Sequence, residues 1–192
     1  MRNFLPLIGT LAALAFVGAT GLAQAQDDSN LTAAQLAAKF QAQQGQLTRG
    51  LVIAPSTGTA TNTTANATTL PADTTYVAMD PKAQVNIQIR FAFDSAALGA
   101  SEDGKLTTLC EAIKASDIPT FKIIGHTDAS GTDSYNQNLS QLRAEEVKRY
   151  LVDNCGIPDG KLVAVGVGEA YPLDAKNPKS DANRRVEFQV GS

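Results

Sequence analysis

The twenty residues from Gly125 to Ala144, GHTDASGTDSYNQNLSQLRA, contain one His, two Asp, two Asn and one Arg. Three of these residues could in principle form a nucleophilic triad: Ser130, His126 and Asp128. All three fall within five residues, and the G-x-S-x-G pattern that presents a nucleophilic serine is absent. A triad also needs an oxyanion hole and a base that is oriented from its far side. The pattern therefore does not favour catalysis.

A metal site is also disfavoured by the spacing of this segment. Asp128, Ser130 and Asp133 offer oxygen ligands, but the D-x-[DN]-x-[DN]-G order and the terminal glutamate of a calcium loop are missing. Two cysteines and one histidine, far apart in the chain, do not have the spacing of a zinc site. We therefore expect no metal and no cofactor.

Recognition of a zwitterion fits these residue types better. Asp128 can accept hydrogen bonds from an ammonium group, and the guanidinium of Arg143 can bind a carboxylate at two points. Backbone amides between Ala129 and Gly131 could add donors for the carboxylate. In the alternative interpretation Asp128 only caps its loop and Arg143 forms a surface salt bridge. The residues alone leave both interpretations open.

The loop must be positioned by the elements around it, which are indicated by their hydrophobic periodicity. Apolar and polar residues alternate from Val85 to Phe91 as in a half-buried strand, and apolar residues have helical spacing at 102–115 and again in the segment that ends at Cys155. The expected order is a strand at 85–91, a helix at 102–115, a strand at 121–124, a helix from about 134 to 155, and strands at 161–167 and 186–190. This β-α-β-α-β-β order predicts an α+β fold with helices on one face of a mixed sheet.

The N-terminal part of the chain, residues 1–77, differs from the rest in composition. Residues 1–25 have a positive start, an uncharged apolar stretch and a small-x-small site, as in a cleaved signal peptide, although an uncleaved anchor is the alternative. Residues 26–55 are expected to hold a short helix from about Ala33 to Gln43, capped by Thr32 and Gln35, and the extended segment Leu51-Val-Ile. Residues 56–77 form a Thr/Ala/Asn-rich linker that we expect to be disordered, and 78–192 form one domain.

Charge and cysteine content narrow the partners and the compartment. With 16 basic and 19 acidic residues the chain is mildly acidic, which disfavours nucleic-acid binding. Cys110 and Cys155 are the only cysteines. In an oxidising compartment such a pair usually forms a disulfide, and two buried free thiols are the alternative. The signal peptide and the cysteine pair together predict a periplasmic protein.

Four ordered motifs carry a family resemblance: FAFDSAAL, GHTDASGTDSYNQNLSQLRAEEVKRYL, GVGEAYPL and NRRVEF. From about Ala83 to Val190 the chain resembles the OmpA-like peptidoglycan-binding domain of outer membrane protein A, Pal and MotB. The resemblance implies a two-layer β-α-β-α-β-β sandwich. It also implies that Asp128 and Arg143 hold diaminopimelate in the peptide stem of peptidoglycan. The resemblance further implies that Asn136 and Arg184 line the pocket and that Asp94 borders it.

These expectations combine into one functional prediction. The chain is expected to bind the cell wall non-covalently near the outer membrane, without enzymatic activity, and residues 26–55 are expected to contact outer-membrane or periplasmic envelope proteins. His126 is expected to be a buried scaffold residue. The alternatives are a protein-interaction module with the same fold, a wall-binding protein tethered to the inner membrane, and a wall hydrolase.

Overall fold

A computed structural model describes residues 27–50, 76–91 and 95–191 of the chain. The expected signal peptide at 1–25, the segment Leu51-Val-Ile, nearly all of the expected linker and Asp94 lie outside the described residues. The α-helices are α1 (Ala33–Gly50), α2 (Asp103–Ala115) and α3 (Asp133–Asp153). The strands are β1 (Val85–Ile87), β2 (Phe121–Gly125), β3 (Leu162–Gly166) and β4 (Val186–Val190), and short 3-10 turns occupy 100–102, 159–161 and 181–183.

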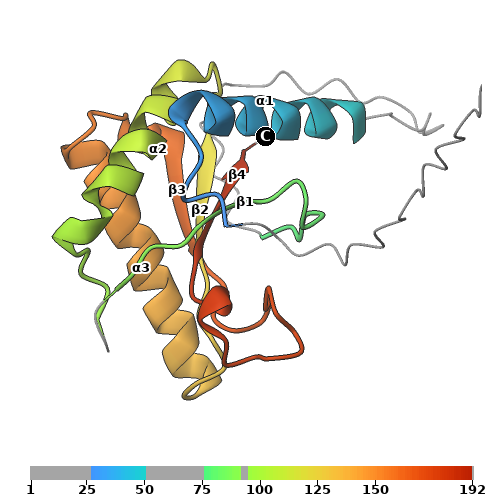
Figure 1. Ribbon diagram of the computed structural model, residues 1–192, viewed down its shortest axis with the longest axis vertical. Coiled ribbons are helices and arrows are strands. Elements are labelled where there is room, and N and C mark those ends of the chain that lie inside the picture. Colours follow the sequence, from blue (N-terminus) through green and yellow to red (C-terminus); the bar gives the residue numbers. More distant parts are fainter. Residues whose placement is uncertain (1–26, 51–75, 92–94, 192) are drawn as a thin grey trace, which may run out of the picture.

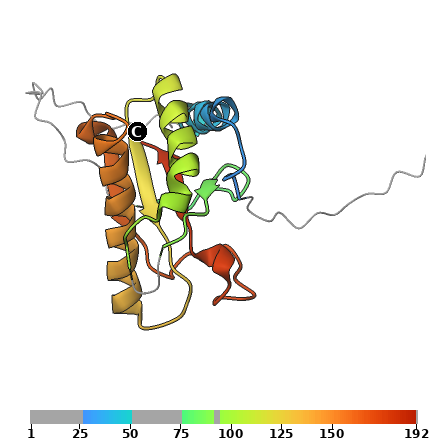
Figure 2. The same cartoon turned by 60° about the vertical axis from the view of Figure 1, so that its left-hand side comes forward.

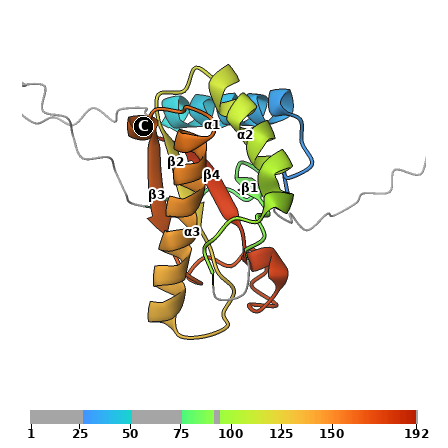
Figure 3. The same ribbon diagram turned by 90° about the vertical axis from the view of Figure 1, so that its left-hand side faces the viewer.

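The four strands form one mixed sheet in the order β1-β4-β2-β3. β4 is antiparallel to both of its neighbours, whereas β2 and β3 are parallel. Figure 3 shows α2 and α3 in front of the same face of this sheet. The predicted α+β class, the β-α-β-α-β-β order and the mixed sheet are therefore confirmed.

One hydrophobic core fills the space between the helices and the sheet. It contains residues of all three helices and of all four strands, and its largest fully buried side chains include Phe40, Phe121 and Phe188. A disulfide joins Cys110 of α2 to Cys155 just beyond α3, with the two Cα atoms 5.9 Å apart. The expected disulfide is thus present, and it connects the two helices that cover the sheet.

Helix α1 packs in this same core and is longer than the sequence indicates. The expected capping box is present, with Thr32 N donating to Gln35 Oε1 at 2.9 Å. The helix continues past Gly45 to Gly50 instead of ending near Gln43. A glycine inside a helix costs only about 1 kcal/mol, which packing of the preceding turns can offset. Figure 2 shows α1 almost end-on beside α2.

The side chain of Gln43 extends the hydrogen bonding of β4 next to the residues that precede β1. Its Nε2 donates to the carbonyls of Ala83 at 2.7 Å and Phe188 at 3.2 Å, and its Oε1 accepts from Val190 N at 3.0 Å. Leu36 and Phe40 of the same helix are almost fully buried. The apolar face of α1 is therefore occupied within the domain.

The first predicted strand is shorter than expected. Regular pairing covers only Val85–Ile87, and Phe91 forms an isolated bridge with Leu98. The chain segment at Asp28 and Ser29 bonds to the free edge of β1, where Asp28 N donates to Asn86 O at 2.8 Å and Gln88 N donates to Ser29 Oγ at 2.9 Å. These contacts replace a longer strand pairing at this edge.

Candidate ligand-binding site

The loop between β2 and α3 lies at the end of the domain opposite α1 (Figure 1). Its conformation is fixed locally. Gly131 has a φ of 111°, which side-chain-bearing residues rarely adopt, and Thr132 caps α3 by accepting a hydrogen bond from Tyr135 N at 3.3 Å. The helix begins at Asp133, one residue before the predicted start.

A pocket of about 710 Å³ opens between this loop, α3 and Arg184. The pocket is lined by Phe91, Thr127, Asp128, Ser130, Gly131, Tyr135, Asn136, Leu139, Arg143 and Arg184. Four of the five residues that the sequence analysis placed at the binding site are therefore in one pocket. The fifth, Asp94, is outside the described residues.

Asp128 is held in a fixed position on the wall of this pocket. Its Oδ1 accepts from Ser130 N at 2.9 Å, and its Oδ2 accepts from Arg184 Nη1 at 2.6 Å. Burial tends to raise the pKa of this carboxyl, but the hydrogen bonds from Arg184 and Ser130 outweigh burial and leave the pKa below its ordinary value. Asp128 is thus an anion at neutral pH, suited to a cationic group.

Arg143 lines the same pocket, and its guanidinium has no ion-pair partner among residues 27–50, 76–91 and 95–191. The residue is 7% exposed; its Nε donates to Ser95 O at 3.3 Å, and its guanidinium lies 4.8 Å from the ring centre of Phe91. Among the described residues no carboxylate lies within 4.0 Å of it. Burial lowers the pKa of Arg143, but an arginine remains charged at physiological pH. A buried cation in this state favours an anionic ligand.

Asn136 lines the pocket, and its amide nitrogen is already engaged with the protein. It is 2% exposed, and Nδ2 donates to the carbonyls of Asp128 and Ser130, both at 3.2 Å, and to the carboxylate of Glu169. These bonds tie the binding loop to α3 and to the segment after β3. The structure therefore shows a positioning role for Asn136 in the shape of the loop.

Arg184 reaches the pocket from the start of β4. Its neighbour Asn183 is fully buried and bonds to the backbone of Asp174, Asn177 and Pro178. Pro178 O in turn accepts from Ala129 N at 3.0 Å. The loop before β4 is thus anchored against the binding loop, which places Arg184 beside Asp128.

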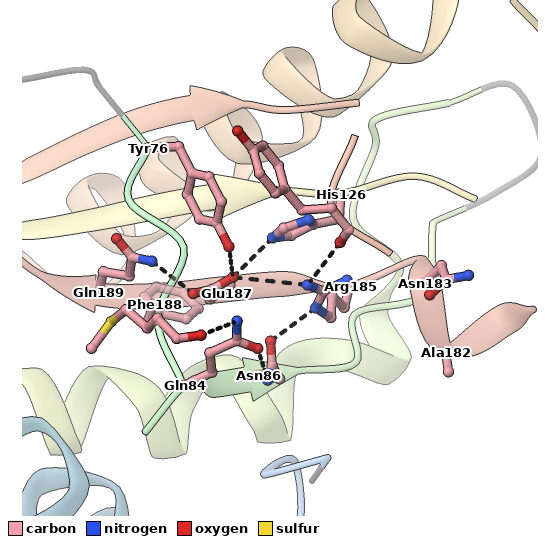
Figure 4. Close-up of polar contacts among 12 residues, drawn as sticks. Tyr76, Gln84, Asn86, His126, Ala182, Asn183, Arg185, Glu187, Phe188 and Gln189 are labelled. Carbon is pink, nitrogen blue, oxygen red and sulfur yellow. Dashed lines mark hydrogen bonds and ion pairs between the residues drawn. The ribbon is translucent and has the colours of Figure 1, made fainter. Parts of the chain in front are cut away.

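His126 precedes the binding residues and belongs to a buried polar cluster on the other side of the sheet (Figure 4). The cluster is centred on Glu187, which is 0% exposed. The Oε2 of Glu187 lies 3.0 Å from His126 Nε2, 3.3 Å from Tyr76 Oη and 3.8 Å from Arg185 Nη2. His126 therefore packs as a scaffold residue, away from the pocket lining.

This cluster predicts a loss of stability in mild acid. Burial lowers the pKa of His126, and the nearby positive charge of Arg185 adds to this effect, although the carboxylate of Glu187 acts to raise the pKa. Below the ordinary His pKa of about 6.5, His126 becomes protonated in the unfolded chain, whereas in the folded chain its lowered pKa keeps it neutral to a lower pH. The free energy of unfolding should therefore fall between pH 7 and pH 5.5, by at most about 1.4 kcal/mol per pH unit.

Urea denaturation across this pH range, with His126→Gln as reference, measures the effect. Since His126 is the only histidine, the variant should lose most of the pH dependence in this interval. Equal slopes for the two proteins would refute a lowered pKa of His126.

The described ranges contain neither a group of metal-ligating residues nor a membrane-spanning helix. In residues 27–50, 76–91 and 95–191 there is no group of three or more His, Cys, Asp or Glu that could hold a metal ion. None of the helices within these ranges is long and apolar enough to cross a membrane.

The α+β fold thus carries one pocket lined by an acidic and two basic side chains. The chain belongs to the OmpA family, whose sequence model matches residues 90–185. Domains of this family bind peptidoglycan in general and are structural or binding proteins, not enzymes. The predicted family is therefore confirmed.

Individual relatives match the same part of the chain. Outer membrane porin F of Pseudomonas aeruginosa is 36% identical over 110 residues, covering 56% of this chain and 31% of the porin. Outer membrane protein A of Bordetella avium is 34% identical over 115 residues, covering 58% of each chain. The chain thus spans less than two thirds of the length of these relatives, which are outer membrane proteins.

The peptidoglycan-associated lipoprotein of Burkholderia pseudomallei is 30% identical to this chain, with a TM-score of 0.45 over 54% of this chain and 88% of the lipoprotein.

Proposed function

We propose that this protein binds peptidoglycan non-covalently by gripping the diaminopimelate residue of its stem peptide. The observation that supports this most directly is that a fixed anion and a buried cation line one pocket, and that the cation has no ion-pair partner in the described part of the chain. Asp128 and Arg143 line the same cavity, and the charge of each acts on the other. The side-chain end of diaminopimelate carries an ammonium and a carboxylate on one carbon, which matches this pair.

In this proposal Asp128 accepts hydrogen bonds from the ammonium group and Arg143 donates two to the carboxylate. Each charge-assisted hydrogen bond contributes about 1.5–3 kcal/mol. The pocket is preformed, because Ser130 and Asn136 already hold the loop around Asp128. Little conformational entropy is then lost when the ligand binds.

The proposed location is the periplasm, where the domain would link the cell wall to the envelope. The relatives named above are outer membrane proteins or, in one case, a peptidoglycan-associated lipoprotein, which supports an envelope location. A role for residues 26–55 in contacting other envelope proteins receives less support, because Leu36, Ala37 and Phe40 of α1 are buried in the domain core.

Co-sedimentation with purified sacculi tests the proposal. Asp128→Asn and Arg143→Ala are each expected to weaken binding by about tenfold or more, since each removes one charged anchor. The matched control is Arg149→Ala on the same helix, because Arg149 is exposed, pairs with Glu146 and does not line the pocket. Circular dichroism checks that the variants are folded. Wild-type sedimentation of both pocket variants would contradict the proposal.

A further inference from the structure

The sheet has two outer edges, and backbone of the N-terminal segment closes one of them. Asp28 and Ser29 bond to β1 at this edge. Strand β3 lies at the other edge (Figure 3), and within the described residues no strand pairs with its outer side. The sequence of β3, LVAVG, is apolar and contains neither a charge nor a proline. An apolar strand at a sheet edge is a template for pairing with another chain.

The outward backbone groups of β3 belong to its even-numbered residues. β2 and β3 pair in parallel, and just after β3 the N–H of Val167 donates to Gly125 O at 3.1 Å. Backbone groups of successive residues alternate in direction along a strand, so the odd-numbered residues of β3 bond to β2. The N–H and C=O groups of Ala164 and Gly166 therefore point away from the sheet.

Two glutamine side chains of α3 bond to these outward groups. Gln141 Nε2 donates to Ala164 O at 3.3 Å, and Gln141 Oε1 accepts from Gly166 N at 2.6 Å. Gln137 Nε2 donates to Gly166 O at 2.7 Å. One residue of an added parallel strand would offer the same pair of groups, an N–H to Ala164 O and a C=O to Gly166 N. The carboxamide of Gln141 thus occupies the place of such a residue.

The spacing of the two glutamines matches the spacing of the strand. Four residues of an α-helix rise about 6 Å, and two residues of a β-strand rise about 6.6 Å. Helix α3 is also held close to β3, because the Cβ position of Gly166 lies 2.7 Å from Gln141 Cα. Positions 137 and 141 of the helix therefore lie along the edge, within reach of its outward groups.

These hydrogen bonds contribute little to the stability of the fold. Gln137 is exposed and Gln141 is half-buried, so water competes for the same groups. Each long side chain also loses rotamer freedom when it is held in place. Alanine is a better helix former than glutamine, which offsets part of any loss on substitution. The main effect of the two side chains is therefore on what the edge can bind.

We propose that Gln137 and Gln141 form a built-in cap on the β3 edge, which prevents a second copy of this chain from pairing its own β3 there. Without the cap, two β3 edges can pair antiparallel about a two-fold axis, since each then presents free N–H and C=O groups. Neither glutamine lines the pocket, so the cap is separate from the proposed ligand binding.

Amide hydrogen exchange of the purified protein, followed by nuclear magnetic resonance, tests whether the cap forms. In the double variant Gln137→Ala/Gln141→Ala at low protein concentration, the amide of Gly166 should exchange about tenfold faster than in the wild type, because its acceptor is removed. The melting temperature should shift by no more than about 2–4 °C. An unchanged exchange rate of Gly166 in a folded double variant would overturn the proposal.

Light scattering over a series of protein concentrations tests what the cap prevents. At high concentration the apparent mass of the double variant should approach about twice that of the wild type, because one free edge accepts one further copy. In the associated form the outward amide of Ala164 should become protected from exchange.

The matched control is Gln41→Ala/Asn138→Ala, which removes two exposed carboxamides that do not take part in these bonds to β3. Its apparent mass should follow that of the wild type. The proposal is overturned if Gln137→Ala/Gln141→Ala keeps the wild-type mass at every concentration, or if it associates without protection of the Ala164 amide.

Discussion

Gly125→Ala is expected to destabilise the domain by about 3 kcal/mol, at the upper end of the usual cost of overpacking. A Cβ at this position would overlap the backbone carbonyl oxygen of Ser140 and would lie 2.9 Å from the carbonyl carbon. A backbone group inside a helix cannot rotate away as a side chain can. The added methyl group would therefore push α3 away from the end of β2.

The same displacement should reduce ligand binding. Gly125 ends β2 just before the Asp128 loop, and Ser140 lies one turn before Arg143 on α3. Moving the helix away from the strand therefore separates the two residues that we propose to bind the zwitterion. Gly166 of β3 makes a similar close approach, with its Cβ position 2.7 Å from Gln141 Cα. Close helix–sheet packing thus sets the geometry of the pocket.

Urea denaturation followed by circular dichroism measures this effect, and Gly104→Ala is the matched control. Gly104 lies in α2 with no heavy atom within 4 Å of its Cβ position, and alanine favours a helix by about 1 kcal/mol over glycine. The control should be as stable as the wild type or more stable. An unchanged denaturation midpoint for Gly125→Ala would show that α3 can shift at little cost.

The local elements and the two central site residues could be predicted from the sequence because they depend on local patterns. Period-two and period-3.6 spacing identify strands and helices directly. Asp128 and Arg143 lie on one loop-helix unit, so their convergence requires only that α3 starts near Asp133. Their chemistry follows from residue type, and the structure places both in one pocket.

Other features depend on contacts between distant parts of the chain. Arg184 meets Asp128 only because β4 pairs antiparallel with β2, and Gln43 meets Val190 across 147 positions. No short-range pattern reports such pairings. More than thirty residues separate α1 from β1, so the sequence places α1 outside the domain expected at 78–192. In the structure, however, Leu36, Ala37 and Phe40 of α1 belong to the common core.

The polar residues of β4 are buried, although their spacing in the sequence is typical of a solvent-exposed face. Alternation of Arg185, Glu187 and Gln189 with apolar residues ordinarily indicates a strand with one solvated face. In the structure all three polar residues are buried. Tyr76 contacts this face through its hydrogen bond to Glu187 and its packing on His126, at a ring-centre distance of 5.9 Å. Burial here is a tertiary property that strand periodicity does not contain.

Glu187→Ala is expected to destabilise the domain by about 3–5 kcal/mol, the usual cost of removing one partner from a buried ion pair. Glu187 is the carboxylate facing Arg185, which is 3% exposed, and it accepts hydrogen bonds from His126 and Gln189. Within the described residues, removing it leaves the buried guanidinium of Arg185 without a counter-charge and bonded to neutral groups such as Asn86 Oδ1 at 2.9 Å. The unpaired charge, more than the lost volume, should cause the loss.

The double variant Arg185→Met/Glu187→Leu separates these two causes. Replacing both charges with apolar groups of similar volume is often nearly neutral, so the double variant should be clearly more stable than Glu187→Ala alone. Glu111→Ala, at an exposed position of α2, should change stability by less than about 0.5 kcal/mol. If the double variant were as unstable as the single one, the stabilising contribution of Glu187 would come from its hydrogen bonds and packing and not from neutralising Arg185.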